Sequence, residues 1–299
     1  MTDIMTVKAI AKGLLTYIPG VVNVLDKKKS STKHSGANAE FCYTLWLSLL
    51  EKIHESGVNP IFERVGELGC GGSVGVGICA LLTGTKQYFA LEIENHFDRE
   101  NNLKLLDEIV TLFKNKTPIS PNFKQLNIHV TNHEYPSHFI IPKFMEDEFV
   151  KVLRNEINSD CIGTKHLNIV YDWQRAPSLS LDLAFSRAVM EHVNNPNSVY
   201  EGLAYNLKPK AFMFHDIEFH SHGITKNKNA HLQISNLWWK IIVGKRSYYQ
   251  NRLKFQDHIN LIEKLNFTVI HTQKSTELDG ASNNEVLIGA TIFAKSNKV

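Results

Sequence analysis

The sequence predicts an α/β protein built on a Rossmann-like, seven-stranded and mostly parallel sheet with helices on both faces. Two observations support this fold. Short apolar runs of strand length alternate with longer segments of helical periodicity along most of the chain, which is typical of strands joined by crossover helices. A glycine-rich turn at residues 69–72 directly follows the first apolar run and precedes a helical segment, which is how a βαβ unit begins.

The expected strands are short aliphatic and aromatic runs between polar or glycine-containing breaks. Two connections are longer than an ordinary loop and carry helical periodicity of their own, at about 98–160 and 218–255. We interpret them as insertions that form a cap. Such a cap would be a lid or part of an acceptor pocket, or it would have no functional role. The expected strands are 61–68, 87–93, 166–171, 181–186, 211–217, 267–272 and 286–294.

The first 60 residues are expected to form an N-terminal helical cap, followed by a main domain over residues 61–299. An apolar stretch at 13–25 predicts an amphipathic helix that packs on the body or rests on a membrane surface. A polar, basic segment at 26–36 then links it to a second helix at 37–56. No stretch reaches the roughly 18 apolar residues that a membrane span needs.

The composition indicates an ordinary globular protein. Hydrophobic residues make up 43% of the chain and charged residues 21%, with 33 basic and 30 acidic side chains. This balance gives no support for a nucleic-acid partner. The four cysteines, Cys42, Cys70, Cys79 and Cys161, show no CxxC or metal-finger spacing, so we expect reduced thiols and a cytoplasmic location.

The glycine turn indicates what kind of cofactor the chain binds. A dinucleotide site has the pattern Gly-x-Gly-x-x-Gly, and here Val74 stands at the third glycine. A site for S-adenosylmethionine (SAM) has an acid at the end of the first strand and then Gly-x-Gly-Gly, which residues 67–72 match. Glu92 ends the second expected strand, where such folds place an acid that accepts hydrogen bonds from ribose hydroxyls.

Together these segments give a family resemblance. The chain resembles the class I SAM-dependent methyltransferases, which implies a methyl-transfer activity with SAM as the cofactor. The matching segments are Val65–Gly72, Ala90–Ile93, Ile169–Asp172, Asp182–His192 and Leu207–Pro209. More narrowly, Phe41–Trp46, Ala80–Gly84, His215–His222 and Asn251–Leu253 are similar to a bacterial subgroup that often accompanies sugar and polysaccharide biosynthesis.

The resemblance also implies roles for individual residues. The acid and glycines of the first turn line the amino-acid end of SAM, and the acid after the second strand holds the ribose. The acid and tryptophan after the third strand flank the adenine, and two residues at the end of the fourth strand lie beside the sulfonium. The implied cofactor residues are Glu67, Gly69, Cys70, Gly71, Glu92, Ile93, Asp172, Trp173, Ser186 and Arg187.

A histidine and acid cluster offers the catalytic groups. A sugar hydroxyl is a poor nucleophile until a base takes its proton, and histidine is the usual base near neutral pH. We favour His220 or His192 as this base, with Asp216 positioning it. Strand alternation would place Asp216, Glu218, His220 and His222 on one side. In an alternative interpretation the carboxylates of this cluster would bind Mg²⁺. The spacing of the residues does not require such an ion, and we predict no metal. These residues are otherwise solvated rim or packing groups.

The acceptor is predicted from the second insertion. Aromatic faces suit sugar rings and basic side chains suit phosphates, which favours a nucleotide- or lipid-linked glycan bearing a phosphate. Otherwise the tryptophans are the buried face of a helix. We therefore predict a SAM-dependent O-methyltransferase that acts on a sugar or glycan intermediate. The alternative acceptor is another small metabolite, and the alternative function is a SAM-binding scaffold without catalysis. The residues concerned are Trp238, Trp239, Lys240, Lys245, Arg246, Tyr248, Tyr249, Asn251 and Arg252.

Overall fold

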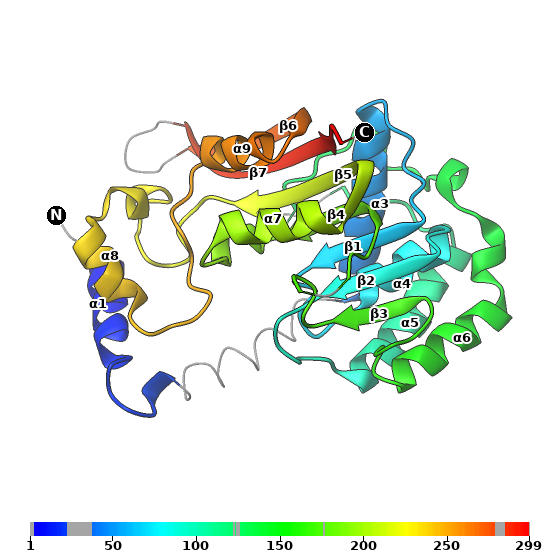
Figure 1. The fold of residues 1–299 in the computed structure, drawn as a ribbon, viewed down its shortest axis with the longest axis horizontal. Helices are drawn as coiled ribbons and strands as arrows, with labels where there is room; N and C mark the ends of the chain where they lie inside the picture. Colours follow the sequence, from blue (N-terminus) through cyan, green and yellow to red (C-terminus); the bar gives the residue numbers. More distant parts are fainter. Residues whose placement is uncertain are drawn as a thin grey trace.

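The computed structural model describes residues 3–22, 38–121, 123, 126–175, 177–278 and 285–298. The predicted linker at 26–36 lies outside these residues. A seven-stranded sheet with the order β3-β2-β1-β4-β5-β7-β6 organises the described chain (Figure 1). The strands are β1 (Arg64–Leu68), β2 (Gln87–Leu91), β3 (Leu167–Val170), β4 (Leu181–Arg187), β5 (Leu207–Glu218), β6 (Phe267–Leu278) and β7 (Glu285–Ser296).

The five strands β1 to β5 run parallel, and β7 is antiparallel to both β5 and β6. This confirms the predicted fold class, a mostly parallel Rossmann-like sheet. Each expected strand segment contains a strand, with shifted ends. β5 begins at Leu207, before the strand expected at 211–217, and β6 continues to Leu278 because it pairs with β7 over its whole length.

Helices cover both faces of the sheet. One buried cluster joins the sheet to α3, α4, α5 and α6, and a second joins it to α7 and α9. Each parallel strand is therefore enclosed by apolar side chains, as crossover connections require. The helices are α1 (Ile4–Leu15), α3 (Ala39–Glu55), α4 (Gly75–Thr83), α5 (Arg99–Lys114), α6 (Asp147–Asn158), α7 (Pro196–Asn206), α8 (Asn236–Val243) and α9 (Phe255–Lys264), with short 3₁₀ turns η1 (Ser137–Phe139), η2 (Pro142–Met145), η3 (Met190–His192) and η4 (Ala230–Gln233).

The segments expected to form a cap pack against two different parts of the structure. α3 packs against α4 and α5, and α6 packs against α5, so residues of the N-terminal segment and the first insertion complete a helix layer on the sheet. α1 packs instead on α8 of the second insertion, beyond the carboxyl ends of the strands (Figure 1). The two helices approach closely because Gly13 has no side chain: a Cβ there would lie 2.0 Å from the carbonyl oxygen of Ile241. The helices α1 and α3 of the first 60 residues therefore pack on different parts of the fold.

Within the described part of the chain, none of the helices combines the length and the apolar character that crossing a membrane demands.

Candidate functional site

The functional side chains converge at the carboxyl edge of the parallel strands. In the order β3-β2-β1-β4-β5, the connections reverse direction between β1 and β4, and ligands of open α/β sheets bind at such a point. The glycine turn follows β1, and Glu92 follows β2. Arg187 ends β4 and Glu218 ends β5. The fold therefore gathers on one edge the candidate residues that are far apart in the sequence.

The glycine turn has a backbone conformation that requires glycine. Gly69 has φ +75° and Gly71 has φ +68°, in the left-handed region that other residues adopt at a cost. A Cβ at Gly69 would also lie 2.6 Å from Val189, whereas one at Gly71 would meet no atom within 4 Å. The turn is therefore packed on one side and open at Gly71, where a ligand can approach the backbone.

Asn102 of α5 holds the glycine turn through hydrogen bonds to its backbone. This role of Asn102 was not predicted from the sequence. Its side chain is fully buried, donates to the carbonyl of Gly72 at 2.8 Å and accepts from the N–H of Val74 at 2.8 Å. An asparagine on the apolar face of an amphipathic helix was the available signal, because a buried amide needs partners.

Two buried carboxylates flank the turn. Glu67 is 6% exposed and accepts a hydrogen bond from the hydroxyl of Tyr88, while Glu92 is 7% exposed and accepts one from the N–H of Gly71. Burial raises the pKa of both carboxyls, and the charge of Glu92 raises the pKa of Glu67 further. A cationic ligand at the turn would offset this desolvation and repulsion.

The remaining cofactor residues predicted near the first three strands differ in exposure. Ile93 is 54% exposed and Asp172 is exposed, so both are accessible at the carboxyl edge. The Cys70 thiol is half-buried, and burial followed by the charge of Glu92 raises its pKa. Trp173 is only 1% exposed and belongs to the buried cluster beneath α7, where Gly202 leaves room for its ring. This burial does not fit the predicted contact of Trp173 with an adenine.

The Ser186 side chain is buried in the core, where it contacts a histidine. Its hydroxyl lies 2.8 Å from Nδ1 of His215, and both side chains are at most 1% exposed. Burial, followed by the charge of His258, lowers the pKa of His215 to about 3, so this ring is neutral. The predicted position of Ser186 beside a sulfonium stays a prediction.

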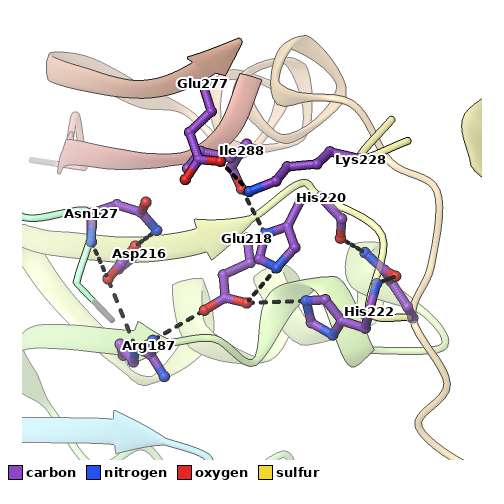
Figure 2. Close-up of polar contacts among 10 residues, drawn as sticks. Asn127, Arg187, Asp216, Glu218, His220, His222, Lys228, Glu277 and Ile288 are labelled. Atoms are coloured by element: carbon purple, nitrogen blue, oxygen red, sulfur yellow. Dashed lines mark hydrogen bonds and ion pairs between the residues drawn. The ribbon is translucent and has the colours of Figure 1, made fainter. Parts of the chain in front are cut away.

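Arg187 ties the end of β4 to β5. Its Nη2 donates to Glu218 Oε1 at 3.0 Å, and its Nε lies 4.0 Å from Asp216 Oδ2 (Figure 2). The guanidinium also lies over the ring of Phe41, 5.6 Å from its centroid. Arg187 therefore holds two acids of β5 in place at the edge of the site.

Asp216 is held away from the histidines. Asn127 donates to both of its carboxylate oxygens, from Nδ2 at 2.7 Å and from the backbone N–H at 3.3 Å (Figure 2). Burial raises its pKa to about 6, against the effect of Asn127 and the charge of Arg187. The sequence predicts that Asp216 positions His220, but the structure gives that contact to Glu218.

Glu218 is the acid at the centre of the histidine cluster. Its Oε2 lies 3.0 Å from Nε2 of His222 and 3.9 Å from Nε2 of His220 (Figure 2). The His192 ring lies 5.0 Å from that of His222. Burial alone would raise the pKa of Glu218, but the hydrogen bond from His222 and the charge of Arg187 lower it. The structure therefore places Glu218, His220 and His222 together, as strand alternation predicts, and brings His192 beside them.

The aromatic and basic residues of the second insertion are mostly engaged in packing. Arg252 donates to the carbonyl of Ile234 and lies over the ring of Trp239, which in turn lies 6.0 Å from Tyr249. Trp238, in contrast, is 49% exposed. The alternative of a packed helix face therefore describes Trp239, and Trp238 remains accessible.

Asn251 has a structural role. Its side chain donates to the carbonyls of Met190 at 2.7 Å and Val193 at 3.1 Å, and its N–H donates to the carbonyl of Glu191 at 2.6 Å. These bonds fix the 3₁₀ turn η3, which carries Glu191 and His192 into the site.

A surface hollow of about 370 Å³ lies at the opposite edge of the sheet, before β1, and is lined by His54, Pro60 and Phe139 among others. Because parallel strands direct their carboxyl ends away from it, this hollow does not belong to the site described above.

Comparison with known proteins gives fold-level similarity only. No protein-family model and no curated protein matches the sequence. Among solved structures, a SAM-dependent methyltransferase from Methanosarcina mazei is 13% identical, with a TM-score of 0.44 over 83% of this chain and 97% of that one. A putative sarcosine dimethylglycine methyltransferase from Galdieria sulphuraria is 12% identical, with a TM-score of 0.46 over 86% of each chain.

A third similar structure is the magnesium protoporphyrin IX methyltransferase from Synechocystis with bound SAH, at 12% identity and a TM-score of 0.43 over 85% of this chain and 82% of that one. Likeness at this level carries no argument about activity, so a functional assignment has to rest on the site residues.

Proposed function

We propose that the protein is a SAM-dependent methyltransferase that binds SAM at the turn after β1. The observation that carries this proposal is the pair of buried carboxylates, Glu67 and Glu92, on either side of a turn that is open at Gly71. SAM has an ammonium group and a sulfonium, so its positive charge offsets the burial of these acids. A dinucleotide would bring a pyrophosphate beside two carboxylates and so increase the repulsion.

Other exposed groups along the same edge fit the rest of such a ligand. Glu92 already touches the glycine turn, and a carboxylate there can accept hydrogen bonds from ribose hydroxyls. The exposed Ile93 and Asp172 follow β2 and β3 and are placed to line an adenine. Trp173 is excluded from this set because it is buried under α7.

The transfer step needs alignment and a base. Bound SAM supplies a methyl group on an already activated sulfonium. The acceptor oxygen forms a bond to the methyl carbon, the sulfur keeps the electron pair of the broken bond, and the hydroxyl proton passes to a base. His220 and His192 are the proposed bases, because their rings lie with that of His222 beside Glu218 at the end of β5.

We infer a sugar or glycan hydroxyl as the acceptor, bearing a phosphate group. The half-exposed Trp238 offers a face for a sugar ring, and the exposed Lys240 and Lys245 offer positive charge nearby. A hydroxyl on another small metabolite is the second candidate acceptor, since the same base would serve it. A SAM-binding scaffold without catalysis would show cofactor binding and no methyl transfer to any acceptor.

We also infer a peripheral membrane contact through α1 and α8. Their outer surface exposes a set of large apolar side chains, and Lys8, Lys12 and Lys240 are exposed on the same two helices. Apolar residues beside lysines suit the headgroup region of an anionic bilayer, where a lipid-linked acceptor would lie. The exposed apolar residues are Ile4, Val7, Leu14, Leu15, Leu237 and Trp238.

Isothermal titration calorimetry with SAM and with NAD(H) tests the cofactor. The proposal expects micromolar binding of SAM, and binding of NAD(H) without SAM would replace it with an oxidoreductase. A panel of nucleotide sugars incubated with methyl-labelled SAM then tests the acceptor, and labelled product from a non-sugar metabolite alone would favour the second candidate.

A further inference from the structure

We propose that the end of β5 and the turn η3 together form a binding site for one divalent transition-metal ion. Glu218, His220 and His222 hold the ion from the β5 side, and Glu191 and His192 of η3 complete the site. Glu218 at the end of β5 and His220 and His222 just after it stand at alternate positions, so an extended chain directs them to one side, as Figure 2 shows. The five side chains come from two segments that meet only in the fold.

The ligand atoms on the β5 side are already close to the spacing that one ion requires. Glu218 Oε2 lies 3.0 Å from His222 Nε2 and 3.9 Å from His220 Nε2, and the three ligand atoms lie within 4.8 Å of one another (Figure 2). Two ligands bound at about 2.1 Å to one ion lie about 3.0–3.4 Å apart. A small inward shift of His220 would therefore place all three on one ion.

Contacts behind these ligands orient them as in metal sites. Nδ1 of His220 lies 3.3 Å from the carbonyl oxygen of Ile288, so a proton on Nδ1 donates to it and leaves the lone pair of Nε2 facing the cluster. Arg187 binds Glu218 through Oε1 and leaves Oε2 for the ion. Hydrogen bonds of this kind fix the ring orientation and basicity of metal ligands.

Glu191 provides an independent indication of a missing cation. It is 3% exposed, and neither of its carboxylate oxygens has a hydrogen-bond partner among the residues that the structure describes. One of these oxygens lies within 4.8 Å of ring nitrogens of His192 and His222. A buried carboxylate without a partner is costly, and a bound cation would supply the partner. Asn251 holds the backbone of this turn in place, because it donates to the carbonyls of Met190 and Glu191.

The donor set selects the kind of ion. Mg²⁺ and Ca²⁺ prefer oxygen ligands and Mg²⁺ keeps several waters, whereas three imidazoles with two carboxylates suit Zn²⁺, Mn²⁺, Fe²⁺ or Co²⁺. This proposal therefore differs from both sequence interpretations, that of no metal and that of Mg²⁺ held through carboxylates alone.

A metal here would also change the roles of the histidines. An ion that binds the acceptor hydroxyl lowers its pKa, so that the proton is released to solvent before the oxygen attacks the methyl carbon. His192 and His220 would then be ligands and not bases. This catalytic role rests on the proposed function, whereas metal binding itself does not.

The test is metal titration of the full-length protein after treatment with EDTA and dialysis. Co²⁺ is titrated first, because ligand-field absorption reports nitrogen and carboxylate ligation directly, and Zn²⁺ is then measured by calorimetry. We expect one equivalent of either ion. His222→Ala should weaken binding about 100-fold or more, and the near-isosteric Glu191→Gln about tenfold or more. His129→Ala is the matched control, because this exposed histidine hydrogen-bonds Ser275 outside the cluster and should leave affinity unchanged.

Absence of Co²⁺ and Zn²⁺ binding by the unsubstituted protein would overturn the inference, and so would unchanged binding by a folded Glu191→Gln and His222→Ala pair. Circular dichroism establishes that each variant is folded. SAM binding is titrated in parallel: SAM binding without metal binding overturns only the metal site, and metal binding without SAM binding overturns only the proposed function.

Discussion

Replacing Glu92 by glutamine should weaken SAM binding without harming the fold. One oxygen of Glu92 accepts from the N–H of Gly71 and the other lies 3.4 Å from the N–H of Ile93, so the second oxygen remains largely available to a ribose hydroxyl. The loss of one hydrogen bond to a charged group costs about 1.5–3 kcal/mol. At about 1.4 kcal/mol per factor of ten, SAM affinity should fall about 10- to 150-fold.

Calorimetric titration of SAM into Glu92→Gln measures this change. The exposed Glu94 provides the matched control, because Glu94→Gln removes an acid two residues away that pairs with His96 and not with the turn. Removing the Glu92 charge also relieves its repulsion of Glu67, so the variant without ligand should unfold at the same temperature or higher. A folded Glu92→Gln that binds SAM within about twofold of the unsubstituted protein would refute this account of the site.

Four further results are expected. In EDTA, Glu191→Gln should raise the free energy of unfolding by about 1–3 kcal/mol at pH 8 and by less at pH 5. Burial raises the pKa of the Glu191 carboxyl in the folded protein, so its charge costs stability only as the pH rises above 4.5. Urea unfolding at both pH values measures this difference, and an equal increase at the two pH values would contradict it. Asn102→Ala should lower the free energy of unfolding by about 1–3 kcal/mol and weaken SAM binding, since it leaves the buried N–H of Val74 without a partner and removes one of the two hydrogen bonds that the Gly72 carbonyl accepts; thermal unfolding and calorimetry check both, and an unchanged melting temperature would be inconsistent with the contact. His220→Ala and His192→Ala should each lower methyl transfer about 100-fold or more while keeping SAM affinity, and full turnover in both would remove them from the site. Trp238→Ser should reduce co-sedimentation with anionic vesicles, and unchanged binding would argue against the membrane face.

The fold was predictable because its signals are local. Apolar runs of strand length, glycine at positions that need a positive φ, and acids at the ends of β1 and β2 are all visible in the sequence. Their order fixes a parallel sheet, and the carboxyl ends of parallel strands share one edge. Glu67, Glu92 and the glycine turn could therefore be named as candidates from their sequence positions alone.

The surroundings of other candidate residues could not be predicted, because they depend on tertiary contacts. Whether an acid at the end of a strand contacts a ligand or other protein groups depends on what packs against it. Asp216 accepts a hydrogen bond from Asn127, which lies in a loop of the first insertion, and the sequence does not indicate this contact. Glu191 becomes notable only because it is buried next to His222, which follows a different strand. Trp173 has the expected sequence position but is covered by α7, whose Gly202 admits its ring.

The packing of the helices expected to form the cap could not be predicted for a similar reason. Helical periodicity predicts that α1 and α3 exist but not which surface each one covers. The wide apolar face of α3 is buried on α4 and α5, whereas Gly13 lets α1 pack closely on α8.

A crystal structure of the protein soaked with SAM tests the central claim most directly. The account predicts that the ribose hydroxyls lie within hydrogen-bonding distance of Glu92 and that the ammonium group lies on the Glu67 side of the turn, against Gly69. SAM bound elsewhere on the chain, or no bound SAM at a saturating concentration, would contradict it.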